Sequence, residues 1–249
     1  MADGIILTYA GEVILLVRYT SELSGLPVTL WGDVHARDVI IRPVGRHDTA
    51  LLAGEVDETA RLCGHDRFCL AFLQVSDWNR DLAPWTSPPV FGDEGFGDGA
   101  PRTLDLIGRG LIPLLDADFP APAPRRYLIA GYSLAGLFAL WAATVSDRFI
   151  GAAGVSPSLW FPGWADYASA HRFHAASVYL SLGDREEKTR NPVMARVGDA
   201  VRAQYAALAA SGKDCALEWN PGGHFRDSDK RTARGSAWLL THLKGDNTI

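Results

Sequence analysis

A serine lies between a short apolar run and a helix-forming segment in the stretch LIAGYSLAGLFAL, which spans residues 128–140. Gly131 stands two positions before this serine, Ser133, and Ala135 stands two positions after it. The pattern predicts a strand, a sharp turn and a helix, and such an elbow exposes the hydroxyl beside free helix N–H groups. A serine held in this way can act as a nucleophile when a base lies next to it. The usual motif, G-x-S-x-G, is relaxed here to alanine at its last position, and an ordinary N-cap serine would fit the same short pattern.

The base for such a serine is expected in a loop after the last strand of the sheet. His224 lies at that place, preceded by two glycines that permit a tight loop. His35, His47 and His65 all precede Ser133, which is not the order in which this architecture uses its histidine. His224 is therefore the candidate base.

An acid that orients the imidazole is expected between the serine and the histidine. The segment SVYLSLGDREEKTRNPVM offers three carboxylates at a predicted strand end, namely Asp184, Glu186 and Glu187. At least two of them belong to the charged first turn of the next helix, where carboxylates favour the helix dipole. Local chemistry slightly favours Asp184, because it lies nearest the strand.

Stabilisation of an oxyanion needs two N–H donors. One would come from Leu134, directly after the nucleophile, and the other from Trp78 or Asn79 in the loop after an earlier apolar run. A plain Asx turn is the alternative interpretation of the sequence SDWN.

Tryptophans are numerous in the segments that follow predicted strands. Clustered at one edge of the sheet, they would wall an apolar acyl or aromatic pocket. The tryptophans in such segments are Trp78, Trp85, Trp160 and Trp164. We take Asn79, Trp85 and Trp160 as candidate substrate-binding residues.

The elements that would position these residues form an α/β pattern. Strands are predicted at 4–8, 13–18, 38–42, 67–75, 126–130, 150–155, 178–182 and 215–219, and helices at 103–115, 134–145, 163–171, 192–210 and 230–243. The alternation after residue 103 predicts a mostly parallel sheet with helices on both faces. The earlier strands, with no helix between them, predict an antiparallel start. The loop at 82–102, rich in Pro, Gly and Asp, is expected to rim a pocket.

Composition narrows the ligand and the setting. A chain of 249 residues with 47% hydrophobic content fits one α/β domain over residues 1–249. A net charge of −5 without any Lys/Arg-rich run disfavours nucleic acid and anionic membranes as partners, and favours a small neutral or mildly polar molecule as the ligand. No cofactor or metal is expected, because there is no clustered Cys/His set and no phosphate-cradling loop.

Cysteine usage and the N-terminal pattern bear on localisation. The three cysteines are sparse and odd in number, which predicts buried thiols and leaves a single Cys63–Cys69 bridge open. The apolar runs near the N-terminus are too short for a signal segment or a membrane span. We therefore expect a reducing, cytoplasmic setting.

Several motifs together resemble one esterase family of the α/β-hydrolases, which includes enterochelin-type siderophore esterases, S-formylglutathione hydrolase and mycolyl transferases. The motifs are SDWNRDLAPW, GYSLAG, GVSPSLWF, SLGDREEKTRNPVM and NPGGHF, and they cover the chain from about Phe68 onward. The resemblance implies an α/β-hydrolase fold and ester hydrolysis without a cofactor by Ser133, His224 and an acid. In that family the acid often stands three residues after a glycine, which implies Glu186, with Asp184 in reserve.

Two other functions remain open at this level. An acyltransferase would use the same acyl-enzyme with a different second nucleophile. A binding protein could retain the fold without turnover, since fold alone does not establish activity.

Overall fold

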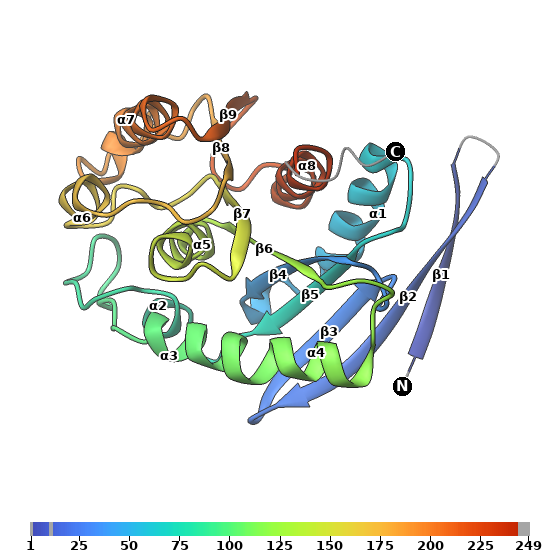
Figure 1. Ribbon diagram of the computed structural model, residues 1–249. Coiled ribbons are helices and arrows are strands. Elements are labelled where there is room, and N and C mark those ends of the chain that lie inside the picture. Colours follow the sequence, from blue (N-terminus) through green and yellow to red (C-terminus); the bar gives the residue numbers. More distant parts are fainter. Residues whose placement is uncertain (1, 10–11, 244–249) are drawn as a thin grey trace.

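The computed structural model describes residues 2–9 and 12–243, with side chains from Leu16 onward. One nine-stranded sheet runs through these residues in the order β1-β2-β3-β5-β4-β6-β7-β8-β9 (Figure 1). Its strands are β1 (Ala2–Tyr9), β2 (Glu12–Leu23), β3 (Leu26–Gly32), β4 (Asp38–Val44), β5 (Cys69–Gln74), β6 (Arg126–Tyr132), β7 (Phe149–Val155), β8 (Ser177–Gly183) and β9 (Asp214–Asn220). Pairing is antiparallel from β1 through β3 to β5 and parallel from there to β9.

Helices cover both faces of the sheet, as predicted (Figure 1). One face carries α1 (Leu52–Cys63) and α8 (Ser228–Thr241), which pack against each other. The other face carries α3 (Ala100–Leu106), α4 (Ile112–Asp118), α5 (Leu134–Val145), α6 (Trp164–Ala170) and α7 (Val197–Ala210). Shorter pieces are η1 (Arg46–Asp48), α2 (Trp78–Asp81), the π-helical η2 (Ile107–Leu111) between α3 and α4, and η3 (Met194–Arg196).

The central strands read as almost continuous apolar runs because they are buried on both sides. Successive side chains of a strand point to opposite faces, so Ile41 joins the core under α5 while Ile40 joins the core under α1 and α8. Both are fully buried. Each such side chain contributes about 1.5 to 3 kcal/mol of transfer free energy on burial. The sheet is thus held between two cores, and the candidate site lies at the carboxyl ends of its strands.

The early part of the sheet differs from the prediction. The strand β3 was missed, and the helix α1 lies between β4 and β5, so that these two strands are parallel rather than antiparallel. A helical crossover of this kind is what a parallel pair requires. The helix was hard to find because its apolar residues, Leu52, Val56 and Ala60, are spaced four apart among polar residues. The antiparallel start is therefore limited to β1–β3 and the edge between β3 and β5.

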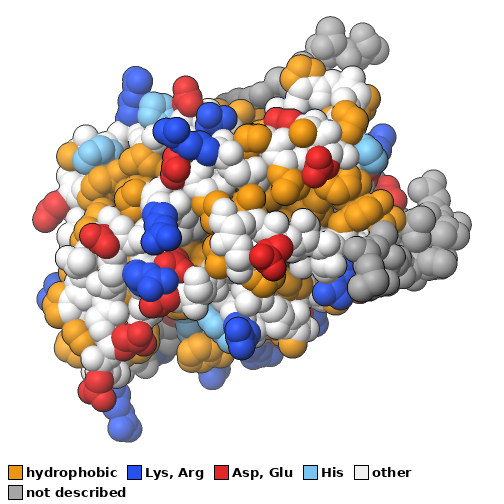
Figure 2. Space-filling model, turned by 90° about the horizontal axis from the view of Figure 1, so that it is seen from below, with side chains coloured by type: hydrophobic (Ala, Val, Ile, Leu, Met, Phe, Trp, Pro, Cys, Tyr) orange, Lys and Arg blue, Asp and Glu red, His pale blue; other side chains and the backbone are white. Residues whose placement is uncertain are grey.

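The charges on the surface and the length and polarity of the helices bear on which partners the protein can bind. On the face seen in Figure 2, acidic and basic side chains lie among each other and separate the hydrophobic patches. This face therefore carries no extended region of one charge sign. Among the residues that the structure describes, no helix is both long and apolar enough to cross a membrane.

Candidate active site

The predicted elbow is present at the end of β6. Ser133 adopts a φ of +59°, a strained value for a residue with a side chain, and its N–H donates to the carbonyl of Val155 at 3.0 Å. Gly131 is required by the close approach of the helix, because a Cβ there would lie 1.9 Å from the carbonyl oxygen of Ala135. Ala135 itself is buried, so its methyl group is accommodated without a glycine at that position. The turn presents the Ser133 hydroxyl at the carboxyl edge of the sheet.

His224 reaches this hydroxyl from the loop after β9. Its Nε2 lies 3.0 Å from Ser133 Oγ. The loop turns at Gly222, whose φ of +103° favours glycine. The hydroxyl of Tyr132, the residue before Ser133, donates to the backbone carbonyl of His224. The histidine is thus held both by its ring and by its main chain.

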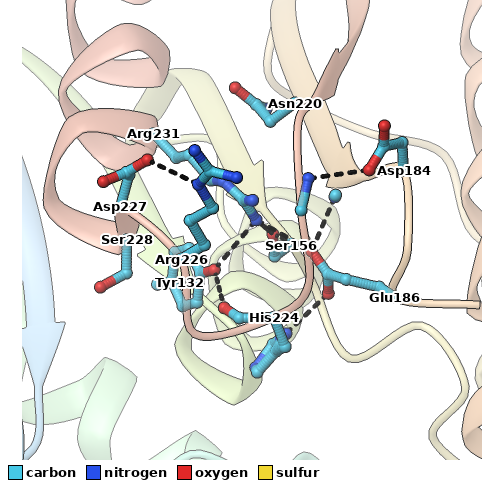
Figure 3. Close-up of polar contacts among 12 residues, drawn as sticks. Tyr132, Ser156, Asp184, Glu186, Asn220, His224, Arg226, Asp227, Ser228 and Arg231 are labelled. Atoms are coloured by element: carbon cyan, nitrogen blue, oxygen red, sulfur yellow. Dashed lines mark hydrogen bonds and ion pairs between the residues drawn. The ribbon is translucent and has the colours of Figure 1, made fainter.

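Glu186 lies in the turn after β8 and faces the other ring nitrogen. Its Oε2 is 2.6 Å from His224 Nδ1, while its Oε1 accepts from the N–H of Gly183 and the hydroxyl of Ser156, each at 2.7 Å (Figure 3). Ser156 has a φ of +43°, a second strained residue at this site. Burial by itself would raise the pKa of Glu186, but the contacts with His224, Ser156 and Gly183 outweigh it and hold the pKa below its ordinary value. The carboxylate is therefore charged at neutral pH.

The neighbouring carboxylates have other partners. Asp184 Oδ1 accepts from the N–H of Gly222 at 2.8 Å and so braces the loop that carries the histidine. Glu187 points away to Arg202 on α7, at 3.0 Å. Among the three candidates, the structure brings Glu186 to His224.

A cavity of about 640 Å³ opens beside Ser133. Besides Ser133 and His224, four of the predicted residues line it, namely Trp78, Asn79, Leu134 and Trp160. Trp78 and Asn79 begin α2 and Leu134 begins α5, so all three carry N–H groups of a first helical turn, which lack intrahelical partners.

Trp85 was expected at this cavity and lies outside the residues described as lining it. Its Nε1 donates to the carbonyl of Pro162 at 2.8 Å, and its ring packs edge-on against Phe161. Trp164, also expected there, is buried in the core. Trp85 supports the pocket wall from behind, because Phe161 in turn packs against the lining residues Trp160 and Phe96.

Several lining residues were missed from the sequence. Phe91 and Phe96 come from the long loop, which forms the expected rim. His47 lies against Trp78 with ring centroids 4.8 Å apart, and it enters through the segment after β4. That segment was overlooked because β4 was assigned as antiparallel, whereas a parallel strand delivers its following loop to the site edge. The remaining lining residues that were missed are Asp48, Leu51, Tyr132, Ser158, Met194, Phe225 and Ser228.

The described residues offer neither a reactive cysteine nor a metal site. All three cysteines are free, and burial raises the pKa of Cys63 to about 11 and that of Cys69 to about 12, so neither is a thiolate at neutral pH. In the described part of the chain, no group of three or more His, Cys, Asp or Glu side chains could hold a metal ion.

The sheet order and the helices on both faces give the chain an α/β-hydrolase fold. The model of the family described as "Putative esterase" matches residues 72–227, well over half of the chain. The chain belongs to this family and is an esterase, which confirms the resemblance inferred from the motifs.

Solved structures with the same fold have low sequence identity. The siderophore hydrolase EstA from Aspergillus nidulans is 19% identical with a TM-score of 0.67, over 91% of this chain and 94% of that one. The enterobactin esterase FES from Shigella flexneri is 16% identical with a TM-score of 0.60, over 97% of this chain and 59% of that one. The enterobactin hydrolase IroE, in a complex with DFP, is 13% identical with a TM-score of 0.62, over 90% of this chain and 94% of that one. A comparison with curated proteins finds no match.

Proposed function

We propose that the protein hydrolyses carboxylic esters through an acyl-enzyme formed on Ser133. The observation that carries this proposal is one unbroken chain of contacts, from the Ser133 hydroxyl through the His224 ring to the Glu186 carboxylate, at 3.0 and 2.6 Å. A nucleophile, a base and an orienting acid in hydrogen-bond reach of one another are the requirements of serine acyl transfer.

In the first half of the reaction, His224 Nε2 takes the proton from Ser133 Oγ as this oxygen attacks the acyl carbon. The tetrahedral oxyanion accepts from the N–H of Leu134 and from that of Trp78 or Asn79. His224 then passes the proton to the leaving alcohol oxygen, and the acyl group stays on Ser133. In the second half, His224 takes a proton from water as the water oxygen attacks the acyl carbon. The bond between the acyl carbon and Ser133 Oγ then breaks, His224 returns the proton to this oxygen, and the carboxylic acid is released.

Glu186 stabilises the charged imidazole during both halves. Its lowered pKa keeps the carboxylate ionised while it accepts from Nδ1, which leaves Nε2 free to receive the serine proton. The α5 helix begins at Leu134, so its positive dipole end also faces the developing oxyanion.

The cavity favours an ester with a flat, apolar group. Its wall includes Trp78, Phe91, Phe96 and Trp160, and its described lining contains no Lys or Arg. Aromatic rings stack well on such walls, and an anionic substrate would find no cation there. The names of the neighbouring structures refer to siderophore and enterobactin esters, and this chain is proposed to act on a neutral aryl or short acyl ester. A single domain over residues 1–249 and a cytoplasmic setting remain part of the proposal, the latter resting on the three free cysteines.

The test is labelling by a fluorophosphonate probe together with turnover of nitrophenyl esters that carry acetyl, butyryl, octanoyl and benzoyl groups. Wild type is expected to be labelled and active, and Ser133→Ala to be neither. Ser158→Ala is the matched control, because its hydroxyl lies only 3.4 Å from that of Ser133 and is expected to be dispensable for labelling.

Other outcomes would redirect the proposal. Labelling that persists in Ser133→Ala would overturn the assignment of the nucleophile. A folded wild type without label or turnover would favour a binding protein. Transfer of the acyl group to an added alcohol in preference to water would favour an acyltransferase.

A further inference from the structure

A single buried guanidinium contacts the segments that carry all three members of the candidate triad. Arg231 lies in the first turn of α8, and its side chain is only 2% exposed. Arginine is almost never buried unless its charge and its donors are paired. The identity of its partners therefore shows what the residue holds in place.

Two contacts of Arg231 are close. Its Nη1 donates to Glu186 Oε1 at 3.2 Å (Figure 3). Its Nη2 donates to the carbonyl of Pro221 at 2.9 Å. Glu186 is the candidate acid, and Pro221 begins the short loop that ends in His224. The guanidinium thus ties the turn after β8 to the loop after β9.

The same Nη1 also lies 3.5 Å from the Tyr132 hydroxyl and from Ser156 Oγ. Tyr132 precedes the nucleophile, and its hydroxyl donates onward to the His224 carbonyl. Ser156 donates to the same carboxylate oxygen that Arg231 contacts. Arg231 and Ser156 thus contact Oε1 of Glu186, which leaves Oε2 to His224.

We propose that Arg231 is a positioning residue of the triad, which holds Glu186 Oε2 toward His224 and fixes the base of the histidine loop relative to the nucleophile elbow. This inference rests on the proposed function. Arg231 does not contact the reacting atoms and acts through Glu186, Pro221 and Tyr132.

Arginine suits this position better than lysine. The planar fork sends one nitrogen to a carboxylate and the other to a carbonyl, which a single ammonium point charge cannot do with the same geometry. The space is also shaped for the fork, because a Cβ on Gly183 would lie 2.8 Å from Glu186 Oε1 and 3.0 Å from Arg231 Nη1. The glycine at the end of β8 therefore makes room for the ion pair.

The test compares Arg231→Met and Arg231→Lys with wild type, and uses Arg234→Met as the matched control. Arg234 lies on the same helix, is partly exposed and donates to Glu218 and Asn220 of β9, so its loss removes a helix charge without removing a contact to Glu186, Pro221 or Tyr132. Each variant is measured for thermal unfolding, for kcat and KM on a nitrophenyl ester, and for the pH profile of kcat/KM.

In Arg231→Met we expect kcat to fall roughly 10- to 100-fold with little change in KM, because a displaced base acts on the chemical step. The acid limb of the profile should also move to higher pH. The charged or titratable groups described around Glu186 are His224, Arg231 and Tyr132, and losing the cation makes protonation of the His224–Glu186 pair easier. Arg231→Lys should restore the acid limb while recovering only part of kcat. Arg234→Met should match wild type in both.

A folded Arg231→Met with the kcat and the pH profile of wild type would overturn the inference. So would a loss of kcat without any shift of the acid limb, since a fixed fraction of inactive protein lowers the rate by the same factor at every pH at which the fold is retained. Should Arg231→Met fail to fold, Arg231→Lys and Tyr132→Phe decide the matter: reduced kcat in both supports the inference, and wild-type kcat in both refutes it. Failure of the proposed function would show separately, as activity that survives Ser133→Ala.

Discussion

Two buried arginine–glutamate pairs in this molecule have opposite designs. In the pair between Arg42 on β4 and Glu55 on α1, both carboxylate oxygens are taken by the guanidinium, at 2.8 and 3.0 Å. In the pair between Arg231 and Glu186, the guanidinium contacts only one oxygen, and the other faces His224. Both pairs are almost fully buried. In the first pair the guanidinium takes both carboxylate oxygens, whereas in the second one oxygen is left to His224.

The difference shows what makes a buried carboxylate available for chemistry. Full burial raises the pKa of Glu55, although Arg42 opposes the change. Glu186 is also buried, but hydrogen bonds from several segments hold its pKa below the ordinary value. A carboxylate that shares its contacts among several donors keeps an oxygen for the histidine, whereas a bidentate pair leaves none.

The largest expected effect separates the two glutamates by activity. Glu186→Gln should lower kcat roughly 10³- to 10⁴-fold, because an amide cannot stabilise the imidazolium or hold its tautomer. Glu55→Gln should leave kcat of the folded protein within about threefold of wild type. Single-turnover and steady-state kinetics on the same ester measure both, and comparable losses in the two variants would contradict the distinction.

The next effect separates them by stability. Removing one member of the Arg42–Glu55 pair, as in Glu55→Gln, should cost about 3 to 5 kcal/mol of unfolding free energy, because Arg42 is left buried without its partner. The double variant Arg42→Met/Glu55→Leu should recover most of this loss, since an apolar pair of similar volume avoids the desolvation penalty. Denaturant unfolding with an activity assay checks both. A double variant as unstable as the single one would show that the pair does more than fill space.

A smaller effect is expected at Asp184, the acid that lies nearest the strand. Asp184→Ala removes the acceptor for the Gly222 N–H and should lower kcat less than about tenfold, through a looser histidine loop. Asp184→Asn, which keeps an acceptor oxygen, should be closer to wild type. A loss as large as that of Glu186→Gln would make Asp184 the acid instead.

The smallest effect is in the pH dependence of stability. The pKa of Glu186 is depressed in the folded state, so its contribution to stability is present above the ordinary value of 4.5 and is lost as pH falls through the folded pKa. The pKa of Glu55 is raised, so its contribution is present below 4.5 and is lost as pH rises toward the folded pKa. Between pH 3 and 7, the unfolding free energy of wild type relative to Glu186→Gln should therefore rise with pH, whereas that of wild type relative to Glu55→Gln should fall with pH. Parallel curves would contradict the assigned directions.

Much of the fold follows from the periodicity of the sequence. The strands and helices after residue 103 are found close to their predicted bounds, because each is a long segment with a clear apolar face or run. The helix α1 and the parallel direction of β4 were not predictable in the same way. Their partners are far away in the chain, and α1 buries only one narrow stripe. The part of the cavity wall at His47, which follows β4, could not be predicted for the same reason.

By itself, the sequence determined the nucleophile candidate, its base and the class of reaction. Ser133 is marked by the small residues that a tight elbow requires, and His224 by its glycine loop after the last strand, and both signals are local. The family resemblance pointed to Glu186 with Asp184 in reserve, but only the tertiary structure showed which of Asp184, Glu186 and Glu187 faces His224, and only it revealed Arg231. These three carboxylates lie within four consecutive positions and have nearly the same chemistry. They differ in the direction in which each side chain points. That direction is set by hydrogen bonds from residues dozens of positions away, which meet only when the strand ends are brought to one edge of the sheet.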